Sequence, residues 1–427
     1  MTTVSRSQAT RRRGIASIAL LVTGMVGLAF SGSISSAAYT DAGFAHSEAL
    51  TAQIDVPFQT GLNSARSVDT AAGVGTDGNA YVWGRTDMKM AGTVPGGTWQ
   101  GATKVGGLPE GEITAVSGQI YGFNGLQRSG EVWGWGYHPA RDGTGTARPD
   151  NRPERIRIGT AWNGGGPVLE NIALISTTEM AGAGVREDGT VWAWGTRTYG
   201  GLGGSGATQV PGLPDPLANG GERFPVYISG GYTTFWIILN NGEVWYWGGD
   251  SSAPRADGTS YDRARMSTAL APWFRTAVGP GDGSVVRVVG GINMGLAVLS
   301  NGRVLTWGGS ARVGNRPTPP DSRDPGLVSE SVLSNIENAV SGFTGALLLD
   351  RAGNLYGYGA SDDYGKNPRT PTLMGTNVTH MAAGQGYYIW RTSNGEYWGQ
   401  GYNPQGVTGT PRGNGLRQIT LDLGILN

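Results

Sequence analysis

The chain has 427 residues, with 32 basic and 32 acidic side chains, 75 glycines, 22 prolines and 14 tryptophans. It contains no cysteine, which excludes disulfides, a thiolate nucleophile, zinc–cysteine sites and a lipoprotein anchor. This much glycine together with regularly spaced tryptophans is typical of short strands joined by many turns, not of a low-complexity chain.

The first 38 residues have the form of an export signal. Arg6 and Arg11–Arg13 precede an apolar stretch from Gly14 to Phe30, and small polar residues continue to Ala38. The apolar stretch is short for a membrane-spanning helix, which favours removal over retention as an anchor. We therefore expect a signal peptide at residues 1–38, a flexible leader at 39–60, and a secreted protein, free or associated with the cell surface.

Removal of this segment would change the charge balance. It holds four arginines and no acid, so the 32 basic groups fall to 28 against 32 acidic ones, a net charge of −4. Nucleic-acid binding depends on clustered positive charge that neutralises phosphates. We expect no nucleic-acid partner, and no membrane contact once the signal is removed.

From residue 61 onwards one pattern occurs seven times. Each unit has a turn glycine, large residues three and five positions later, and a further glycine at position six. The turn glycines are Gly78, Gly130, Gly189, Gly242, Gly302, Gly353 and Gly395. The residues at position five are Trp83, Trp135, Trp194, Trp247, Trp307, Tyr358 and, as the exception, Gln400. Self-similarity at a regular period indicates a repeat protein.

Each unit is predicted to be a β-hairpin. Most of the turns are Asn-Gly or Asp-Gly, which suit two-residue hairpin turns with positive φ at both positions. Positions three and five lie on one face of the following strand because side chains alternate along a strand. One hairpin cannot bury such a stripe of rings alone, whereas stacked units can. We predict that the large rings at position five form the core between units.

The turn glycines are separated by 52, 59, 53, 60, 51 and 42 residues, which is room for about four short strands and a longer loop in each unit. A solenoid would need atypical terminal repeats, and the first and last units are ordinary members. The segment Leu416–Leu423 has strand character and is expected to complete the last unit. The predicted fold class is all-β, a closed seven-bladed β-propeller at residues 61–427, and we expect a monomer.

The unit Asp188-Gly-Thr-Val-Trp-Ala-Trp194-Gly195 resembles the repeat of the regulator-of-chromosome-condensation family, over essentially residues 61–427. The resemblance implies a seven-bladed propeller. The chain differs from the family's repeat in two ways. No histidine lies in the strand before the hairpin, and the Gly-Gln-Leu-Gly segment that follows Trp-Gly in the family is present only in part, for example as Gly201-Leu202-Gly203. The family carries unrelated functions on one scaffold, so fold alone does not assign one.

Within this family, the secreted β-lactamase inhibitory protein of the second type is the nearest in compartment, and it binds its target through aromatic residues on one face. The resemblance implies contacts just after the glycines that open the inner strands of each blade. One bulky residue recurs there in six units: Tyr121, Met180, Tyr232, Met294, Phe343 and Tyr387. We predict that they form a partner-binding ring, because aromatic residues and Met are enriched at interface cores. The alternative is that they fill the channel or pack under loops.

A second candidate surface consists of the long loops that follow Trp-Gly, which are rich in Gly, Pro, Asp and Arg. Such loops often carry recognition, although each one alone is more typical of a solvated connection. The loops are 137–151, 199–216, 250–262 and 310–324. The predicted partner is a protein or a cell-wall component of unknown identity.

Enzymatic signals are weak. The three histidines, His46, His138 and His380, lie far apart in sequence, and nothing local marks a serine nucleophile. Two catalytic carboxylates are harder to exclude, since Asp and Glu are plentiful and their spacing across blades cannot be read from the sequence. Turn chemistry explains most Asp residues in the repeats. Acidic pairs such as Asp362-Asp363 lack the ligand spacing of a calcium loop, so we expect no metal and no cofactor.

The predicted function is therefore a secreted, non-enzymatic binding module. An extracellular polysaccharide lyase or hydrolase remains the alternative. Carboxylates together with Arg or Tyr in the central region would favour the enzyme, and a bare aromatic rim would favour binding.

Overall fold

The computed structural model describes residues 70–86, 90–95, 100–120, 122–136, 152–159, 166–202, 206–218, 223–279, 281–308, 323–343, 345–359, 371–384, 386–401 and 415–419. The chain divides into two units, Met1–Ser35 and Ser36–Asn427, and every described residue belongs to the second. The expected signal peptide and leader lie outside the described residues.

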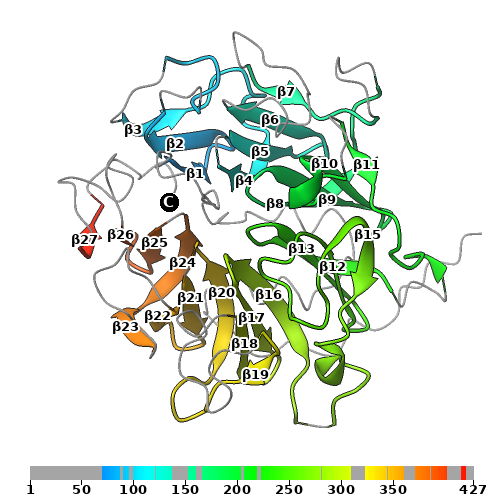
Figure 1. Ribbon diagram of the computed structural model, residues 1–427. Helices are drawn as coiled ribbons and strands as arrows, with labels where there is room; N and C mark the ends of the chain where they lie inside the picture. The colour runs from blue at the N-terminus through cyan, green and yellow to red at the C-terminus, as the bar shows by residue number, and fades with distance from the viewer. Residues whose placement is uncertain are drawn as a thin grey trace, which may run out of the picture. The chain divides into compact units, whose positions relative to one another are not determined.

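Within Ser36–Asn427 the strands form seven antiparallel sheets, which we call blades 1 to 7 in chain order (Figure 1). The first three blades contain β1 (Thr70–Val74), β2 (Ala80–Gly84) and β3 (Gln100–Lys104); β4 (Ile113–Gln119), β5 (Gly122–Gln127), β6 (Val132–Gly136) and β7 (Glu154–Arg155); and β8 (Ile172–Thr177), β9 (Ala181–Arg186), β10 (Val191–Gly195) and β11 (Thr208–Gln209). Blades 4 and 5 contain β12 (Pro225–Gly230), β13 (Thr234–Leu239), β14 (Val244–Gly248) and β15 (Ser260–Met266); and β16 (Val285–Gly291), β17 (Met294–Leu299), β18 (Val304–Gly308) and β19 (Gly326–Leu327). Blades 6 and 7 contain β20 (Ile336–Ser341), β21 (Gly345–Asp350), β22 (Leu355–Gly359) and β23 (Thr372–Gly375); and β24 (Val378–Ala383), β25 (Tyr387–Thr392), β26 (Tyr397–Gly401) and β27 (Arg417–Gln418).

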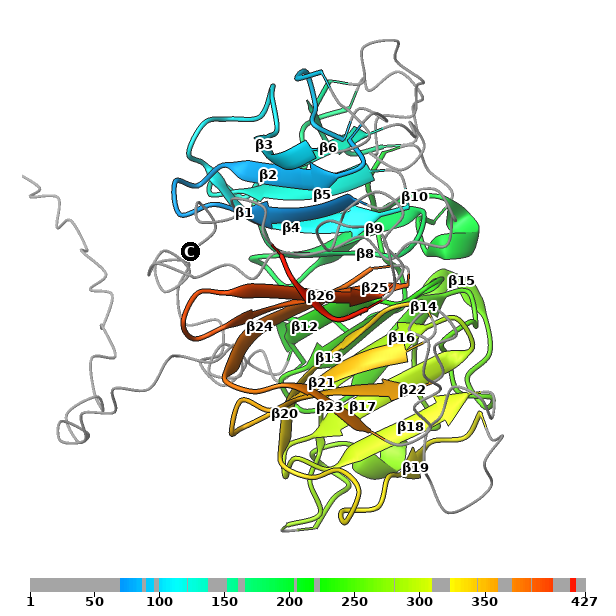
Figure 2. The ribbon, with the colours of Figure 1, turned by 90° about the vertical axis from the view of Figure 1, so that its left-hand side faces the viewer.

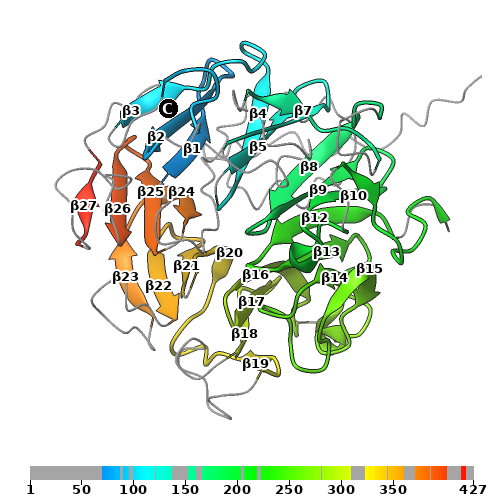
Figure 3. The same ribbon diagram turned by 45° about the horizontal axis from the view of Figure 1, so that its top comes forward.

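The blades close into a ring, so the predicted all-β, seven-bladed propeller is confirmed. Figure 3 shows the first strands of blades 3 to 7 toward the middle and the last strands, such as β15, β19 and β27, at the periphery. The first and last blades lie next to each other in the side view (Figure 2). There Ala71 and Trp83 of blade 1 share one buried cluster with Tyr387 and Ile389 of blade 7.

The strand predicted at the end of the chain is present in its described part. Gln418 and Arg417 of β27 pair with Trp398 and Gly399 of β26 and complete blade 7. In blade 1 three strands are described, and β1 corresponds to the second strand of the other blades because it directly precedes the hairpin turn.

The hairpin turns differ from the two-residue form that the sequence suggested. In blade 3 the Gly189 amide donates to the Arg186 carbonyl at 2.8 Å, and the Arg186 amide donates to the Thr190 carbonyl at 2.8 Å. Only the glycine of this turn has left-handed φ, at +81°. The turn is a type I turn closed by a glycine bulge, which needs one left-handed residue instead of two. This explains why Ser and Ala are tolerated before the glycine in blades 2 and 6.

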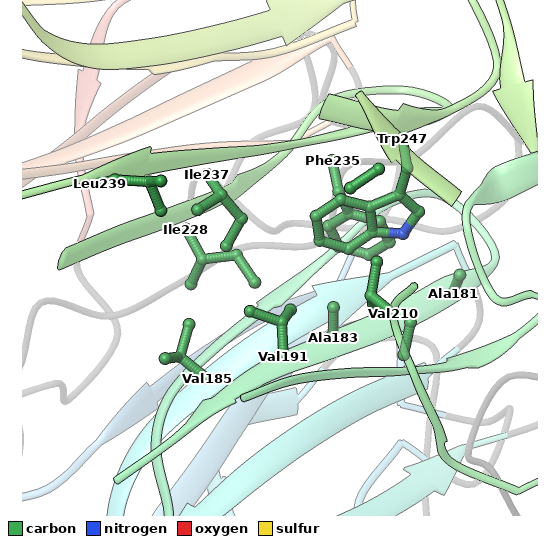
Figure 4. Close-up of a cluster of buried hydrophobic side chains, with 12 residues drawn as sticks. Ala181, Ala183, Val185, Val191, Val210, Ile228, Phe235, Ile237, Leu239 and Trp247 are labelled. Atoms are coloured by element: carbon green, nitrogen blue, oxygen red, sulfur yellow. The ribbon is translucent and has the colours of Figure 1, made fainter. Parts of the chain in front are cut away.

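The position-five rings are buried, and Trp194 for example shares a cluster with Leu126 and Val132 of the preceding blade. Trp83, Trp135, Trp194, Trp247, Trp307 and Tyr358 are each at most 1% exposed. Each ring lies opposite either a small residue or a second ring on the preceding strand. Trp194 pairs with Gly182, and a methyl group on that glycine would lie 2.3 Å from the indole nitrogen. Trp247 pairs with Phe235, whose ring stacks on it with centroids 5.0 Å apart (Figure 4).

The buried indole N–H groups bond to the preceding blade. Trp247 Nε1 donates to the Gly200 carbonyl at 2.9 Å, and Trp307 Nε1 donates to the Ser252 carbonyl at 2.7 Å. Both acceptors lie in the segment that follows the Trp-Gly of the blade before. Gly200 has a φ of +95°, and a side chain there would meet the Phe235 ring at 2.6 Å. The residues that follow Trp-Gly in blades 3 and 4 therefore contribute to blade packing, since a buried indole donor needs an acceptor.

In blade 7 the rings that fill the space toward the preceding blade come from the second strand instead of the third. Gln400, which replaces the ring at position five, is only partly buried and pairs with Tyr388 of β25. Tyr388 and Trp390 are 3% and 1% exposed, and they pack against Leu347 and Leu349 of blade 6. The missing ring is thus supplied by the neighbouring strand.

Candidate binding surface on the turn face

The strands alternate in direction, so the turns between first and second strands and the segments after third strands lie on one face of the ring. We call this the turn face. All five of the predicted binding residues that the structure describes occupy these turns or the start of the strand that follows: Met180, Tyr232, Met294, Phe343 and Tyr387. Tyr121 lies outside the described residues.

Two of these five residues do not present their side chains to solvent. Tyr387 is 0% exposed, and its hydroxyl donates to the Thr70 carbonyl of blade 1 at 2.8 Å. Met294 is 1% exposed and packs in the core shared with Ala346 and Tyr358 of blade 6. The expectation of a bulky rim is corrected for these two positions, because the neighbouring blade offers each a more apolar environment than water does.

Tyr232 and Phe343 are brought together although they come from blades 4 and 6. Their ring centroids are 5.6 Å apart with the planes at 83°. Tyr199, from the 3-10 helix η2 (Arg197–Tyr199) after β10, also meets Tyr232, with centroids 6.1 Å apart and the planes at 75°. All three rings are partly exposed, and edge-to-face contacts of this kind are favourable arrangements of aromatic quadrupoles.

Glu179 adds a carboxylate to these rings. It lies in the turn between β8 and β9, is 3% exposed, and is close enough to Tyr199 for its charge to act on that hydroxyl. Burial, followed by the charge of Glu179 and the neighbouring Tyr232, raises the pKa of Tyr199 to about 12. We call Glu179, Tyr199, Tyr232 and Phe343 the turn-face cluster.

Backbone hydrogen bonds between neighbouring turns hold the cluster in place. The Ile120 amide of blade 2 donates to the Glu179 carbonyl at 3.0 Å, and the Glu179 amide donates to the Tyr232 carbonyl at 3.1 Å. Further along the ring, the Ile292 amide donates to the Phe343 carbonyl at 2.7 Å. These bonds fix the backbone that carries the rings, which lowers the entropy lost on binding a partner.

Hydroxyl groups on the inner strands strengthen the same region. Ser117 of β4 and Thr177 of β8 share a hydrogen bond of 2.8 Å, and the Thr177 hydroxyl also donates to the Gly118 carbonyl. Between blades 5 and 6, the Ser341 hydroxyl donates to the Gly290 carbonyl at 2.8 Å. The polar inner strands are therefore bonded to each other, and the cluster rests on a rigid support.

Met180, the remaining predicted residue, is half-buried beside the cluster, and its carbonyl accepts a hydrogen bond from the Thr196 amide at 2.9 Å. Sequence reasoning missed Tyr199 and Glu179 as members. Their signals were present, because Tyr199 opens one of the long loops and Glu179 directly precedes Met180.

Two of the rings at position three of the repeat, Trp192 and Trp133, are partly exposed, unlike the buried rings at position five. Trp192 is partly exposed, its indole N–H bonds to the Thr190 hydroxyl at 3.1 Å, and the Arg186 guanidinium lies 4.8 Å from its ring centroid. Trp133 has an equivalent bond to Gln127 at 2.9 Å and a stacked Arg155. The indole donor and one ring face of each residue are therefore occupied by partners within its own blade.

The Tyr199 hydroxyl is not set up as a general base. A tyrosine base needs a pKa near the working pH, whereas the pKa of Tyr199 is raised. Among the described residues, no group of three or more His, Asp or Glu side chains is arranged to hold a metal ion. His380 lies on β24 with its Nδ1 3.0 Å from the Thr379 hydroxyl, and His46 and His138 are outside the described residues. None of the described helices has the length and apolar character needed to cross a bilayer.

The protein is a seven-bladed β-propeller that carries an aromatic cluster on its turn face. Comparison with known proteins shows which folds this chain is similar to. No protein-family model matches the chain. A segment of 267 residues, 60% of this chain, is 26% identical to the E3 ubiquitin-protein ligase HERC2 of Homo sapiens and spans only 5% of that ligase; the Mus musculus protein matches at 25%.

Solved structures give the same result. Prp20p of Saccharomyces cerevisiae superposes with a TM-score of 0.62 at 17% identity, covering 80% of this chain and 86% of Prp20p. Yeast RCC1 (Prp20) bound to Kap60 gives 0.61 at 15%, covering 92% and 89%. Human WBSCR16 gives 0.57 at 15%, covering 74% and 82%. The protein is a seven-bladed β-propeller with the fold of yeast RCC1, and its repeats are similar to those of the regulator-of-chromosome-condensation type.

Proposed function

We propose that this protein is an exported, non-enzymatic binding module that holds a protein partner on its turn face. The observation that carries the proposal is the contact of Tyr232 with both Tyr199 and Phe343, which gathers partly exposed rings from three blades. Aromatic residues concentrate at the cores of interfaces, and here the backbone beneath them is fixed by hydrogen bonds between turns.

The structural relatives support a protein partner. Prp20p was described together with its binding to Gsp1p and histones. A closed ring with short inner turns presents a stable surface whose side chains vary freely, so different members can recognise different proteins.

The binding test uses three immobilised proteins: the wild type, the double variant Tyr232→Ala/Phe343→Ala, and Leu217→Ala as a matched control. Leu217 is 68% exposed and lies between β11 and β12, on the face opposite the turn face. Each is exposed to native culture fluid and to cell-wall extract. A protein retained by the wild type and the control but lost from the double variant supports the proposal.

Equal retention by all three proteins would move the site to another surface. Retention of a wall polymer instead of a protein would change the partner class. Binding of neither, with turnover in a polysaccharide screen, would favour the lyase or hydrolase alternative.

Export is tested separately by sequencing the N-terminus of protein recovered from the medium. We expect a start at Ala38 or Tyr39, following the small residues after the apolar stretch. Protein that stays with the cells and begins at residue 1 would contradict cleavage.

A further inference from the structure

The turn-face cluster combines two features that act together on positive charge. Tyr199, Tyr232 and Phe343 are partly exposed rings in edge-to-face contact, so ring faces with negative potential are turned in different directions. The buried Glu179, whose amide bonds to the Tyr232 carbonyl, adds a carboxylate whose charge acts on the Tyr199 hydroxyl. Cations are attracted to aromatic faces within about 6 Å, more strongly where water is partly excluded.

We propose that the turn-face cluster is a receptor for one cationic side-chain group, the ammonium of a lysine or the guanidinium of an arginine, presented by the partner. This inference rests on the proposed function and names the chemistry that the same site recognises. The rings contact the cation and its aliphatic stem, and the Glu179 carboxylate attracts its charge through a medium of low dielectric constant.

Other ligand classes fit less well. A phosphate or carboxylate would meet the charge of Glu179 at short range, and like charges at an interface are strongly unfavourable. A purely apolar side chain would cover the tyrosine hydroxyls and the carboxylate without replacing their interactions with water, which costs free energy. A cation on an aliphatic stem can pack its stem and charge against the rings and is attracted by the Glu179 carboxylate.

The hydroxyl of Tyr199 supports this arrangement. It stays protonated across the physiological range, because burial and the charge of Glu179 raise its pKa to about 12. The nearby Arg197 does not supply a competing cation, because it forms an ion pair with Asp262 at 2.5 Å. The net charge of −4 expected for residues 39–427 also favours encounter with a basic partner.

The test measures binding of three small amides to the purified protein by ligand-observed NMR. N-acetyl-lysinamide and N-acetyl-argininamide carry the cation, and N-acetyl-norleucinamide is a neutral analogue with a similar stem. We expect the cationic amides to bind about tenfold more tightly than the neutral one. Comparison of the two cationic amides shows whether ammonium or guanidinium is preferred.

Three variants locate the site. Tyr232→Ala/Phe343→Ala is expected to weaken binding of the preferred amide about tenfold, and Glu179→Gln several-fold, while Leu217→Ala leaves it unchanged. Single Tyr232→Ala and Phe343→Ala variants serve if the double variant loses its folded circular dichroism. Equal binding of the neutral amide, or cation binding unaffected by these folded variants, would overturn the inference.

This outcome is separable from that of the proposed function. If the cluster variants lose the captured protein but no variant changes amide binding, the turn face binds a partner without a cation receptor. If cationic amides bind at the cluster while the captured protein is retained by every variant, the receptor exists and the partner uses another surface.

Discussion

The contact between blades 3 and 4 and the contact between blades 6 and 7 fill the same kind of space in different ways. Between blades 3 and 4, Trp247 on the third strand stacks on Phe235 and bonds to the Gly200 carbonyl of the blade before. Between blades 6 and 7, the third strand offers only Gln400, and the rings of Tyr388 and Trp390 come from the second strand.

The difference shows that the fold requires a filled space between blades and not a ring at one position of the repeat. Adjacent strands of an antiparallel pair present opposed residues on the same face, about 5 Å apart, so either strand can supply the volume. In the pair of Trp194 with Gly182 the third strand carries the large side chain, whereas in the pair of Tyr388 with Gln400 the second strand carries the ring. Tight packing then decides which substitutions each blade tolerates.

The largest expected effect comes from removing a third-strand ring. Trp194→Ala leaves a cavity beside Gly182 between blades 2 and 3 and should lower the free energy of unfolding by about 3–5 kcal/mol. Trp192→Ala on the same strand is the control, because that ring is partly exposed and should cost distinctly less. Urea denaturation of both variants measures the difference, and equal losses would contradict separate roles for the two rings.

Restoring the repeat pattern in blade 7 should destabilise it. Gln400→Trp places a ring opposite Tyr388, where the space is already filled, and should cost about 1–3 kcal/mol. Adding Tyr388→Gly recreates the pairing of Trp194 with Gly182 and should recover part of that loss. Thermal unfolding of the single and double variants tests this exchange, and a double variant less stable than the single one would argue against it.

The inner strands depend on hydroxyl bonds where the outer parts of the blades depend on rings. Thr177→Val keeps the shape of the side chain but removes its bonds to Ser117 and to the Gly118 carbonyl. Because both partners are buried, we expect a loss of about 1–3 kcal/mol, at the lower end if the strands relax. Thr177→Ser is the control that keeps the hydroxyl, and its stability should lie closer to the wild type in the same urea experiment.

The smallest expected effect is a dependence on high pH. The pKa of Tyr199 is about 12, above its ordinary value of about 10, so the protonated hydroxyl stabilises the fold fully below pH 10. This contribution is lost as pH rises from about 10 to 12. The stability difference between wild type and Tyr199→Phe should shrink over that range, by less than about 1 kcal/mol because the side chain is partly exposed. The pKa of Tyr246 is also raised to about 12, but it titrates in both proteins and cancels in the difference.

The candidate site was only partly predictable. Tyr232 and Phe343 were expected on the binding face, and the structure adds that they touch each other across two blades. Tyr387 and Met294 occupy equivalent turns but point into the core. Their direction depends on neighbours distant in sequence, as the bond from Tyr387 to Thr70, 317 residues away, illustrates.

The sequence by itself determined the number of blades, the central hairpin of each, and the rings of the core, because these follow from local periodicity and turn glycines. Tertiary structure alone decided how blade 7 compensates for Gln400, which bulky turn residues are buried, and that Glu179 and Tyr199 join Tyr232. The physical reason is that closing a ring brings side chains of different repeats into contact, and such contacts leave no periodic trace in the chain.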